Sequence, residues 1–147
     1  MNSNKYKMES LFFCIFGLFH IHRIWAFINA KGYNVFWLNV LRNKNIFFYI
    51  LGIILVSLAI IALAFFVKFF KEKKWWRWIY LFGGIYVLID CILNLLDNNF
   101  MAYVVMKMYT LKQPFYNILW SFFILVGIIC MIFSKYLWSY SNENRDK

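Results

Sequence analysis

Four long apolar segments, separated by polar or basic stretches, dominate the hydrophobic pattern of the chain. They cover residues 10–30, 46–67, 78–96 and 115–134. The second and fourth segments contain no charged residue, and each is as long as the helix of about 20 residues that crosses a hydrocarbon core. The pattern therefore predicts an all-α fold, an integral membrane bundle of four transmembrane helices that forms a single domain over residues 1–147.

The first segment is the least apolar of the four, and it admits two interpretations. Its apolar run ends at Phe19, and two histidines and Arg23 interrupt it before it resumes. The alternative to a span is a cleaved signal peptide, with Lys5 and Lys7 as its basic start and cleavage after Ala30. Charged and polar residues directly before such a cleavage site are unusual, so we favour a span.

The connections at residues 31–45 and 97–114 are more apolar than ordinary solvated loops. Bulky apolar side chains recur in both of them. Segments of this kind lie along a membrane surface or cap a helix bundle. We expect both to be amphipathic outer segments, and we expect Phe36 and Trp37 in the first one to face a partner.

Composition supports a membrane protein and argues against nucleic acid as a partner. The chain is 64% hydrophobic and 15% charged, whereas soluble domains are near half apolar and about one quarter charged. Its net charge is +10, but the cations lie mostly at the ends of the apolar segments and not on one polar face. By the positive-inside rule, both termini and the loop at 68–77 are predicted to be cytoplasmic.

The loop at 68–77 combines clustered cations with tryptophans. Each cation near a membrane surface attracts anionic headgroups by about 1 kcal/mol. The sequence therefore predicts that this loop contacts anionic lipid, although a role in setting topology alone is equally compatible with it. The cations predicted to make this contact are Lys71, Lys73, Lys74 and Arg77.

One ionisable residue, Asp90, lies inside the third apolar segment. A carboxylate at the centre of a membrane helix costs about 2.5–3.5 kcal/mol on insertion scales, so it should face the protein interior or a water-filled cavity. Helical spacing places it on one stripe with three other polar residues. The stripe consists of Tyr86, Asp90, Asn94 and Asp97.

In the first segment, His20 and Arg23 share a helix face because they are three residues apart. The opposite directions of the first and third spans would bring them to the same half of the membrane as Asp90. We therefore predict a polar site with an ion pair between Arg23 and Asp90 or Asp97. Such a site either binds a cationic group or relays protons, or it only fixes how the two helices pack.

No catalytic, cofactor or metal motif is present in the sequence. It lacks histidine boxes, nucleophile elbows, phosphate-binding glycine loops and zinc signatures. We therefore expect no cofactor, no metal and no catalytic residue. An enzyme acting on a lipid or quinone would draw on His20, His22, Asp90 and Asp97, and it is the least favoured alternative.

Two resemblances bear on function. The segment from Phe16 to His20 resembles the histidine-terminated first helix of DoxX-like small four-helix membrane proteins. In size, charge and aromatic content the chain is similar to bacterial immunity proteins, a similarity that implies protection of a producer's membrane from its own pore-forming toxin. The richness in Asn, Lys, Ile, Phe and Tyr favours a bacterial source.

From these observations we expect a non-enzymatic protein of the bacterial plasma membrane. It would recognise a membrane-active protein or peptide, as an immunity protein does, or serve as an accessory subunit of a larger membrane complex such as a transporter. The main alternative is a carrier or channel subunit that uses Asp90 for a proton or cation. A chain of 147 residues would then need partners to enclose a pathway, and a homo-oligomer is compatible with this.

Overall fold

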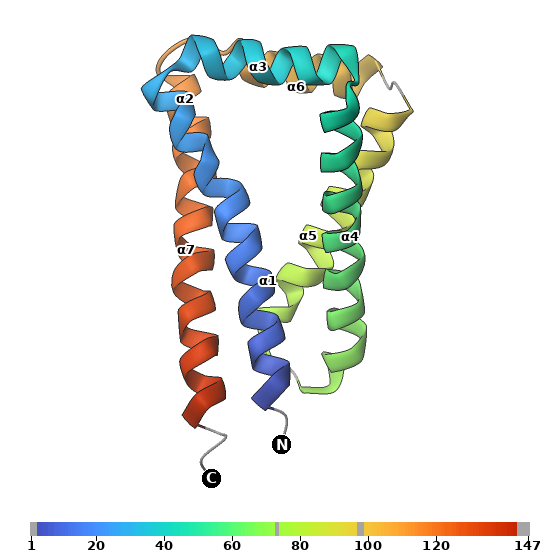
Figure 1. Cartoon of the computed structure of the whole chain (residues 1–147), viewed down its shortest axis with the longest axis vertical. Coiled ribbons are helices and arrows are strands. Elements are labelled where there is room, and N and C mark those ends of the chain that lie inside the picture. Colours follow the sequence, from blue (N-terminus) through green and yellow to red (C-terminus); the bar gives the residue numbers. More distant parts are fainter. Residues whose placement is uncertain (1–2, 73, 97–98, 144–147) are drawn as a thin grey trace. The chain divides into compact units, whose positions relative to one another are not determined.

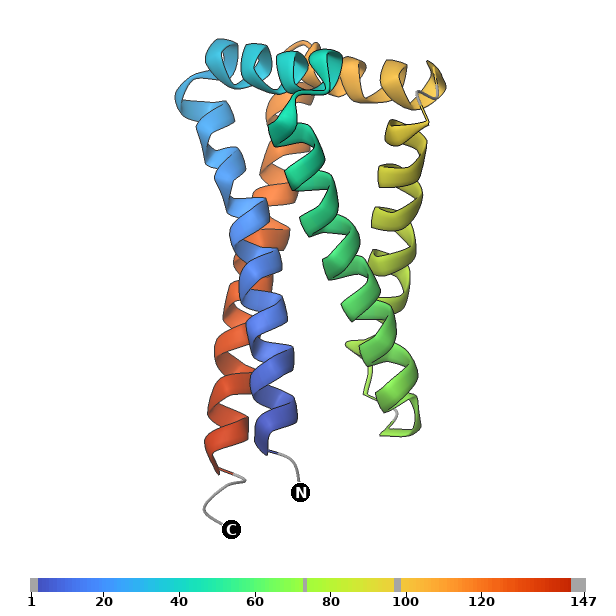
Figure 2. The same cartoon turned by 45° about the vertical axis from the view of Figure 1, so that its right-hand side comes forward.

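The computed structural model describes residues 3–72, 74–96 and 99–143 of the chain (Figures 1 and 2). The structure is 91% helical and has no strands among these residues, which confirms the predicted all-α class. The helices in chain order are α1 (Ser3–Ile21), the 3-10 turn η1 (His22–Ile24), α2 (Trp25–Ile28), α3 (Ala30–Asn43), α4 (Ile46–Phe69), the 3-10 turn η2 (Phe70–Glu72), α5 (Arg77–Leu95), α6 (Asn99–Tyr109) and α7 (Phe115–Glu143).

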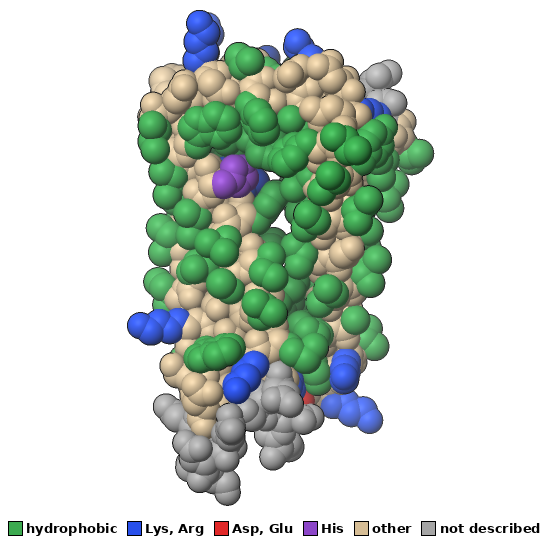
Figure 3. All heavy atoms as spheres, in the orientation of Figure 1, with side chains coloured by type: hydrophobic (Ala, Val, Ile, Leu, Met, Phe, Trp, Pro, Cys, Tyr) green, Lys and Arg blue, Asp and Glu red, His purple; other side chains and the backbone are tan. Residues whose placement is uncertain are grey.

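Four helical segments are long and apolar enough to cross a membrane. They are Lys5–Ile28, Ile46–Glu72, Arg77–Leu95 and Phe115–Asn142. Each of them overlaps one of the four apolar segments predicted from the sequence. Hydrophobic side chains cover the length of the helices, and the lysine and arginine side chains lie mostly near the helix ends (Figure 3).

Helix α7 extends beyond the predicted end at residue 134 and continues to Glu143. The mean hydropathy falls at Lys135, which suggested an end there. Leu137 and Ser141 are nevertheless fully buried, and Tyr140 packs edge-on against Tyr6 with ring centroids 5.0 Å apart. Contacts with α1 therefore continue the helix past the point where hydropathy declines.

The chain divides into two compact units, each made largely of one pair of long helices. Residues 1–35 and 110–147 form the first, which we call the terminal unit, and residues 36–109 form the second, the central unit. The prediction of a single domain stays a prediction.

In the terminal unit, α1 and α7 pack as an antiparallel pair along their length, so both chain ends lie at the same end of this unit (Figures 1 and 2). The Ser10 hydroxyl donates to the Ser134 carbonyl oxygen at 2.7 Å, and the Ser134 hydroxyl donates to the Ser10 carbonyl oxygen at 2.8 Å. Next to this reciprocal pair, Phe13 meets Phe133 edge-on at 4.8 Å.

Helices α1 and α7 approach each other closely at two glycines. A Cβ atom on Gly17 would lie 2.9 Å from the Gly127 carbonyl oxygen, and a Cβ atom on Gly127 would lie 2.9 Å from the Gly17 carbonyl oxygen. Only residues without side chains permit this backbone contact, which is a common basis of helix association in membranes.

The central unit is built on α4 and α5, an antiparallel pair joined by η2 and the residues that follow it. Gly84 packs against α4, where an added Cβ would meet Leu63 at 3.0 Å and the Ala59 carbonyl oxygen at 3.1 Å. Phe65 and Tyr80 meet at 5.7 Å between ring centroids. Helix α4 begins where the Asn45 side chain accepts a hydrogen bond from the Phe48 backbone N–H at 3.1 Å, a standard N-cap.

Both predicted outer segments contain a helix. Residues 31–45 include most of α3, and residues 97–114 include α6. Within the central unit, the later part of α3 leads into the start of α4, and α6 follows the end of α5. Both lie crosswise to the α4–α5 pair (Figures 1 and 2). The two are linked by a contact of 4.0 Å from the Arg42 guanidinium to the Met106 sulfur.

Candidate functional site

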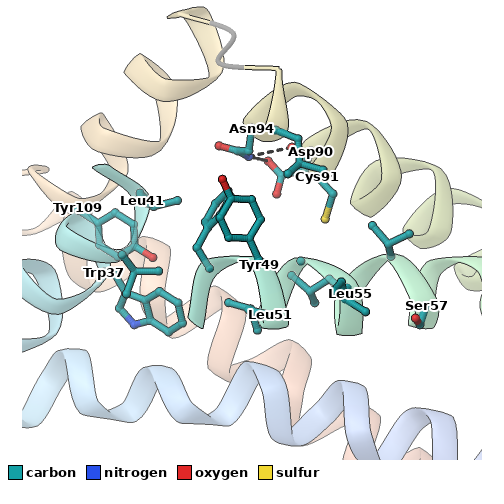
Figure 4. A pocket seen from close by; sticks show the side chains of 16 residues that line it. Trp37, Leu41, Tyr49, Leu51, Leu55, Ser57, Asp90, Cys91, Asn94 and Tyr109 are labelled. Atoms are coloured by element: carbon teal, nitrogen blue, oxygen red, sulfur yellow. Dashed lines mark hydrogen bonds between the residues drawn. The ribbon is translucent and has the colours of Figure 1, made fainter. Parts of the chain in front are cut away.

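The central unit contains a cavity of about 460 Å³. It is lined by side chains of α3, α4 and α5 and by Tyr109 at the end of α6 (Figure 4). Its volume lies within the range of about 300–1,000 Å³ that is typical of small-molecule sites. Asp90 is the only charged residue among the residues that line it.

Asp90 is positioned by Asn94, one helical turn further along α5. The Asn94 side-chain amide donates to Asp90 Oδ1 at 3.1 Å and to the Asp90 carbonyl oxygen at 2.8 Å. The spacing of four residues on one helix brings these groups together. The Tyr49 hydroxyl of α4 points toward the same two residues (Figure 4). Asp90, Asn94 and Tyr49 therefore form a polar part of the cavity lining.

The remaining walls are predominantly apolar and aromatic. Trp37 and Leu41 come from α3, and Leu51 and Leu55 come from α4. Gly52 also lines the cavity, and a Cβ added there would meet no atom within 4 Å. The missing side chain of Gly52 thus leaves part of this space open.

The residues of the predicted polar stripe have different surroundings. Asp90 and Asn94 line the cavity, whereas Tyr86 does not line it and is 64% exposed. Helical spacing places residues on one face but does not indicate over which turns a neighbouring helix leaves a cavity. Asp97, the last member of the stripe, lies outside the described residues.

Phe36 and Trp37, which were predicted to face a partner, have different surroundings. Trp37 lines the cavity, while Phe36 is partly exposed and packs against Phe47 with ring centroids 5.8 Å apart. Adjacent residues on a helix point about 100° apart. Both rings pack against Phe47 of α4, but only Trp37 reaches the cavity. Trp37 and Asp90, assigned to separate sites from the sequence, therefore line one cavity.

His20 and Arg23 belong to the terminal unit. The Arg23 guanidinium donates to His20 Nδ1 at 3.0 Å and to the Phe19 carbonyl oxygen at 3.1 Å. It also lies 4.7 Å from the ring centroid of Phe123, within cation–π distance. Because Arg23 and Asp90 fall in different units, the ion pair between them stays a prediction.

His22 packs within the terminal unit as well. Its Nδ1 atom contacts the Phe19 carbonyl oxygen, and its Nε2 atom lies 3.4 Å from the Tyr33 hydroxyl. Among the described residues, no three histidine, cysteine or acidic side chains come together as a metal-binding group would require.

Arg77, a cation of the basic loop, is paired inside the central unit. Arg77 is 2% exposed, pairs with Glu72 Oε2 at 2.8 Å and donates to the Phe69 carbonyl oxygen. A headgroup contact by Arg77 would require this pair to open. Lys71 is exposed and Lys74 is half-buried, so these two remain candidates for lipid contact, and Lys73 lies outside the described residues.

Several residues of interest carry little or no signal in the sequence. Tyr49 and Gly52 stand in a continuous apolar run, where a tyrosine or a glycine is unremarkable. Tyr109 lies in an outer segment that already contains other aromatics. Glu9 lies near the start of the first segment, yet its side chain is fully buried in the terminal unit. A carboxylate so close to an apolar run was the one detectable signal among them.

Comparison with known families finds no family model that matches the chain, and comparison with curated proteins and solved structures finds no significant match. The resemblance of Phe16–His20 to DoxX-like proteins therefore gains no support.

Proposed function

We propose that the chain is a non-enzymatic, multi-pass membrane protein that recognises a membrane-active partner through the cavity of its central unit. A cationic amphipathic toxin or peptide is the concrete form of this partner, which makes an immunity-type role the best supported one. An accessory subunit of a larger membrane complex would use the same surface.

One observation carries this proposal: Trp37 and Asp90 line the same cavity. A tryptophan supplies a large rigid contact surface, and a carboxylate supplies charge selectivity, which is the combination typical of recognition sites. The lining therefore favours binding over catalysis.

Insertion in the membrane is supported by the four helices long and apolar enough to cross it. With each of them crossing once, both chain ends and the loop between α4 and α5 lie on one side. The cations of that loop and of the termini make this the cytoplasmic side by the positive-inside rule. The bacterial plasma membrane is the location we propose.

A leakage assay tests the proposed role. The protein is reconstituted in liposomes loaded with a self-quenching dye, and the liposomes are exposed to a panel of cationic amphipathic pore-forming peptides. We expect wild-type protein to slow leakage by at least one peptide. Trp37→Ala and Asp90→Asn should each weaken this protection by about tenfold, the equivalent of ~1.4 kcal/mol.

Tyr86→Phe is the matched control, because Tyr86 lies one turn from Asp90 on α5 but outside the cavity lining. It should protect as wild type does. Wild-type protein that protects against no peptide contradicts the proposed role.

A carrier or channel subunit is the second candidate, and the position of Asp90 in a cavity favours it over an enzyme. The same liposomes without peptide distinguish the two roles. Proton or cation flux that requires Asp90 supports the carrier role. Peptide protection without such flux supports the recognition role.

A further inference from the structure

The cavity of the central unit combines a single carboxylate with apolar and aromatic walls. We propose that it binds a lipophilic organic cation, one positive charge surrounded by apolar substituents, with Asp90 as its counter-charge. This inference rests on the proposed binding role and specifies the chemical class of the group that enters the cavity.

Asp90 has no positively charged partner in the cavity lining. The Asn94 amide reaches Oδ1, but an amide is neutral and leaves the negative charge uncompensated. Among the described residues of the central unit, no lysine or arginine forms an ion pair with Asp90. Carboxylates in apolar surroundings are normally paired, so a bound ligand is the natural source of the positive charge.

The aromatic and aliphatic walls of the cavity favour an organic cation. Four aromatic rings line the cavity, those of Trp37, Phe48, Tyr49 and Tyr109. Aromatic faces attract organic cations, most strongly where water is excluded. Leucine, isoleucine and valine side chains supply most of the remaining surface. A ligand that matches both the carboxylate and the apolar walls has one positive charge surrounded by apolar substituents.

A metal ion fits this lining poorly. Calcium takes about six to eight oxygen ligands, and magnesium requires an octahedral set. The lining offers one carboxylate together with the amide of Asn94 and the hydroxyls of tyrosine and serine residues. A single delocalised or shielded charge is better matched to one carboxylate.

The probe we choose is methyltriphenylphosphonium, a cation with apolar substituents. Triphenylphosphine oxide is its neutral counterpart of nearly the same shape. Binding of each is measured by equilibrium dialysis to the full chain in nanodiscs of phosphatidylcholine, with empty nanodiscs as the blank. We expect saturable binding of the cation and binding at least about tenfold weaker for the neutral compound.

Two kinds of variant locate the binding. Asp90→Asn keeps the size of the side chain and removes its charge, and it should weaken cation binding by about tenfold to a hundredfold. Gly52→Leu places a side chain in the cavity and should abolish binding. Gly83→Leu is its matched control, because a Cβ added at Gly83 also meets no atom within 4 Å, but Gly83 lies outside the lining.

Absence of saturable binding by wild type overturns the inference, and so does equal binding of the neutral compound or unchanged binding by folded Asp90→Asn. If Asp90→Asn does not fold, the cation and neutral pair on wild type and the two glycine variants decide the question. Peptide protection without cation binding would refute this ligand class and leave the proposed function standing. Cation binding without peptide protection would refute the proposed recognition of a membrane-active partner and leave the ligand class standing.

Discussion

The position of Asp90 follows from the free-energy cost of exposing a carboxylate to lipid. A carboxylate in an apolar segment must avoid lipid, and the structure puts it in the lining of a cavity beside Asn94. The same reasoning does not extend to Tyr86, because a tyrosine tolerates exposure to lipid or its interface. It also gave no indication of Tyr49, whose role depends on how α4 faces α5.

Gly17 gives the sharpest prediction at the residue scale. Gly17→Ala should destabilise the protein by about 1–3 kcal/mol, the usual effect of overpacking, because the new methyl group would lie 2.9 Å from the Gly127 carbonyl oxygen. The free energy of unfolding in mixed detergent micelles measures this. Gly83→Ala, which adds the same methyl group in open space, serves as the control, and equal effects of the two variants would refute the close contact.

At the scale of elements, hydropathy predicted all four apolar helices, while their ends and partners depend on contacts. Helix α7 continues to Glu143 because Leu137 and Ser141 pack after the apolar run has ended. The first apolar helix passes through the 3-10 turn η1 at the position of the histidines and Arg23. Both outer segments contain helices, but which of their side chains line a cavity depends on neighbouring helices.

Two exposed lysines test how these elements are placed across the membrane. Lys71 follows α4, and Lys112 precedes α7. In a background with Cys14, Cys91 and Cys130 replaced, we expect a membrane-impermeant maleimide to label Lys112→Cys in intact cells. Lys71→Cys should react only after the membrane is permeabilised, because opposite sides follow from one further crossing by α5. Equal labelling of both positions in intact cells would exclude this topology.

At the scale of the whole molecule, the sequence predicted the helix class and the number of apolar helices, but not which helices pair. Hydropathy is nearly uniform along such helices, so it contains little information on their neighbours. Pairing depends on local shape, such as the contact of Gly17 with Gly127 and of Gly84 with α4. For the same reason, the sequence assigned Trp37 and Asp90 to separate sites.

A double-mutant cycle on methyltriphenylphosphonium affinity tests the central claim that Trp37 and Asp90 form one binding site. The cycle compares wild type, Trp37→Ala, Asp90→Asn and the double variant. We predict a coupling energy above about 0.5 kcal/mol, as expected for residues that share a ligand. The parallel cycle with Phe36→Ala should be additive, because Phe36 does not line the cavity. Additive effects of Trp37→Ala and Asp90→Asn, or no binding by wild type, would contradict the claim.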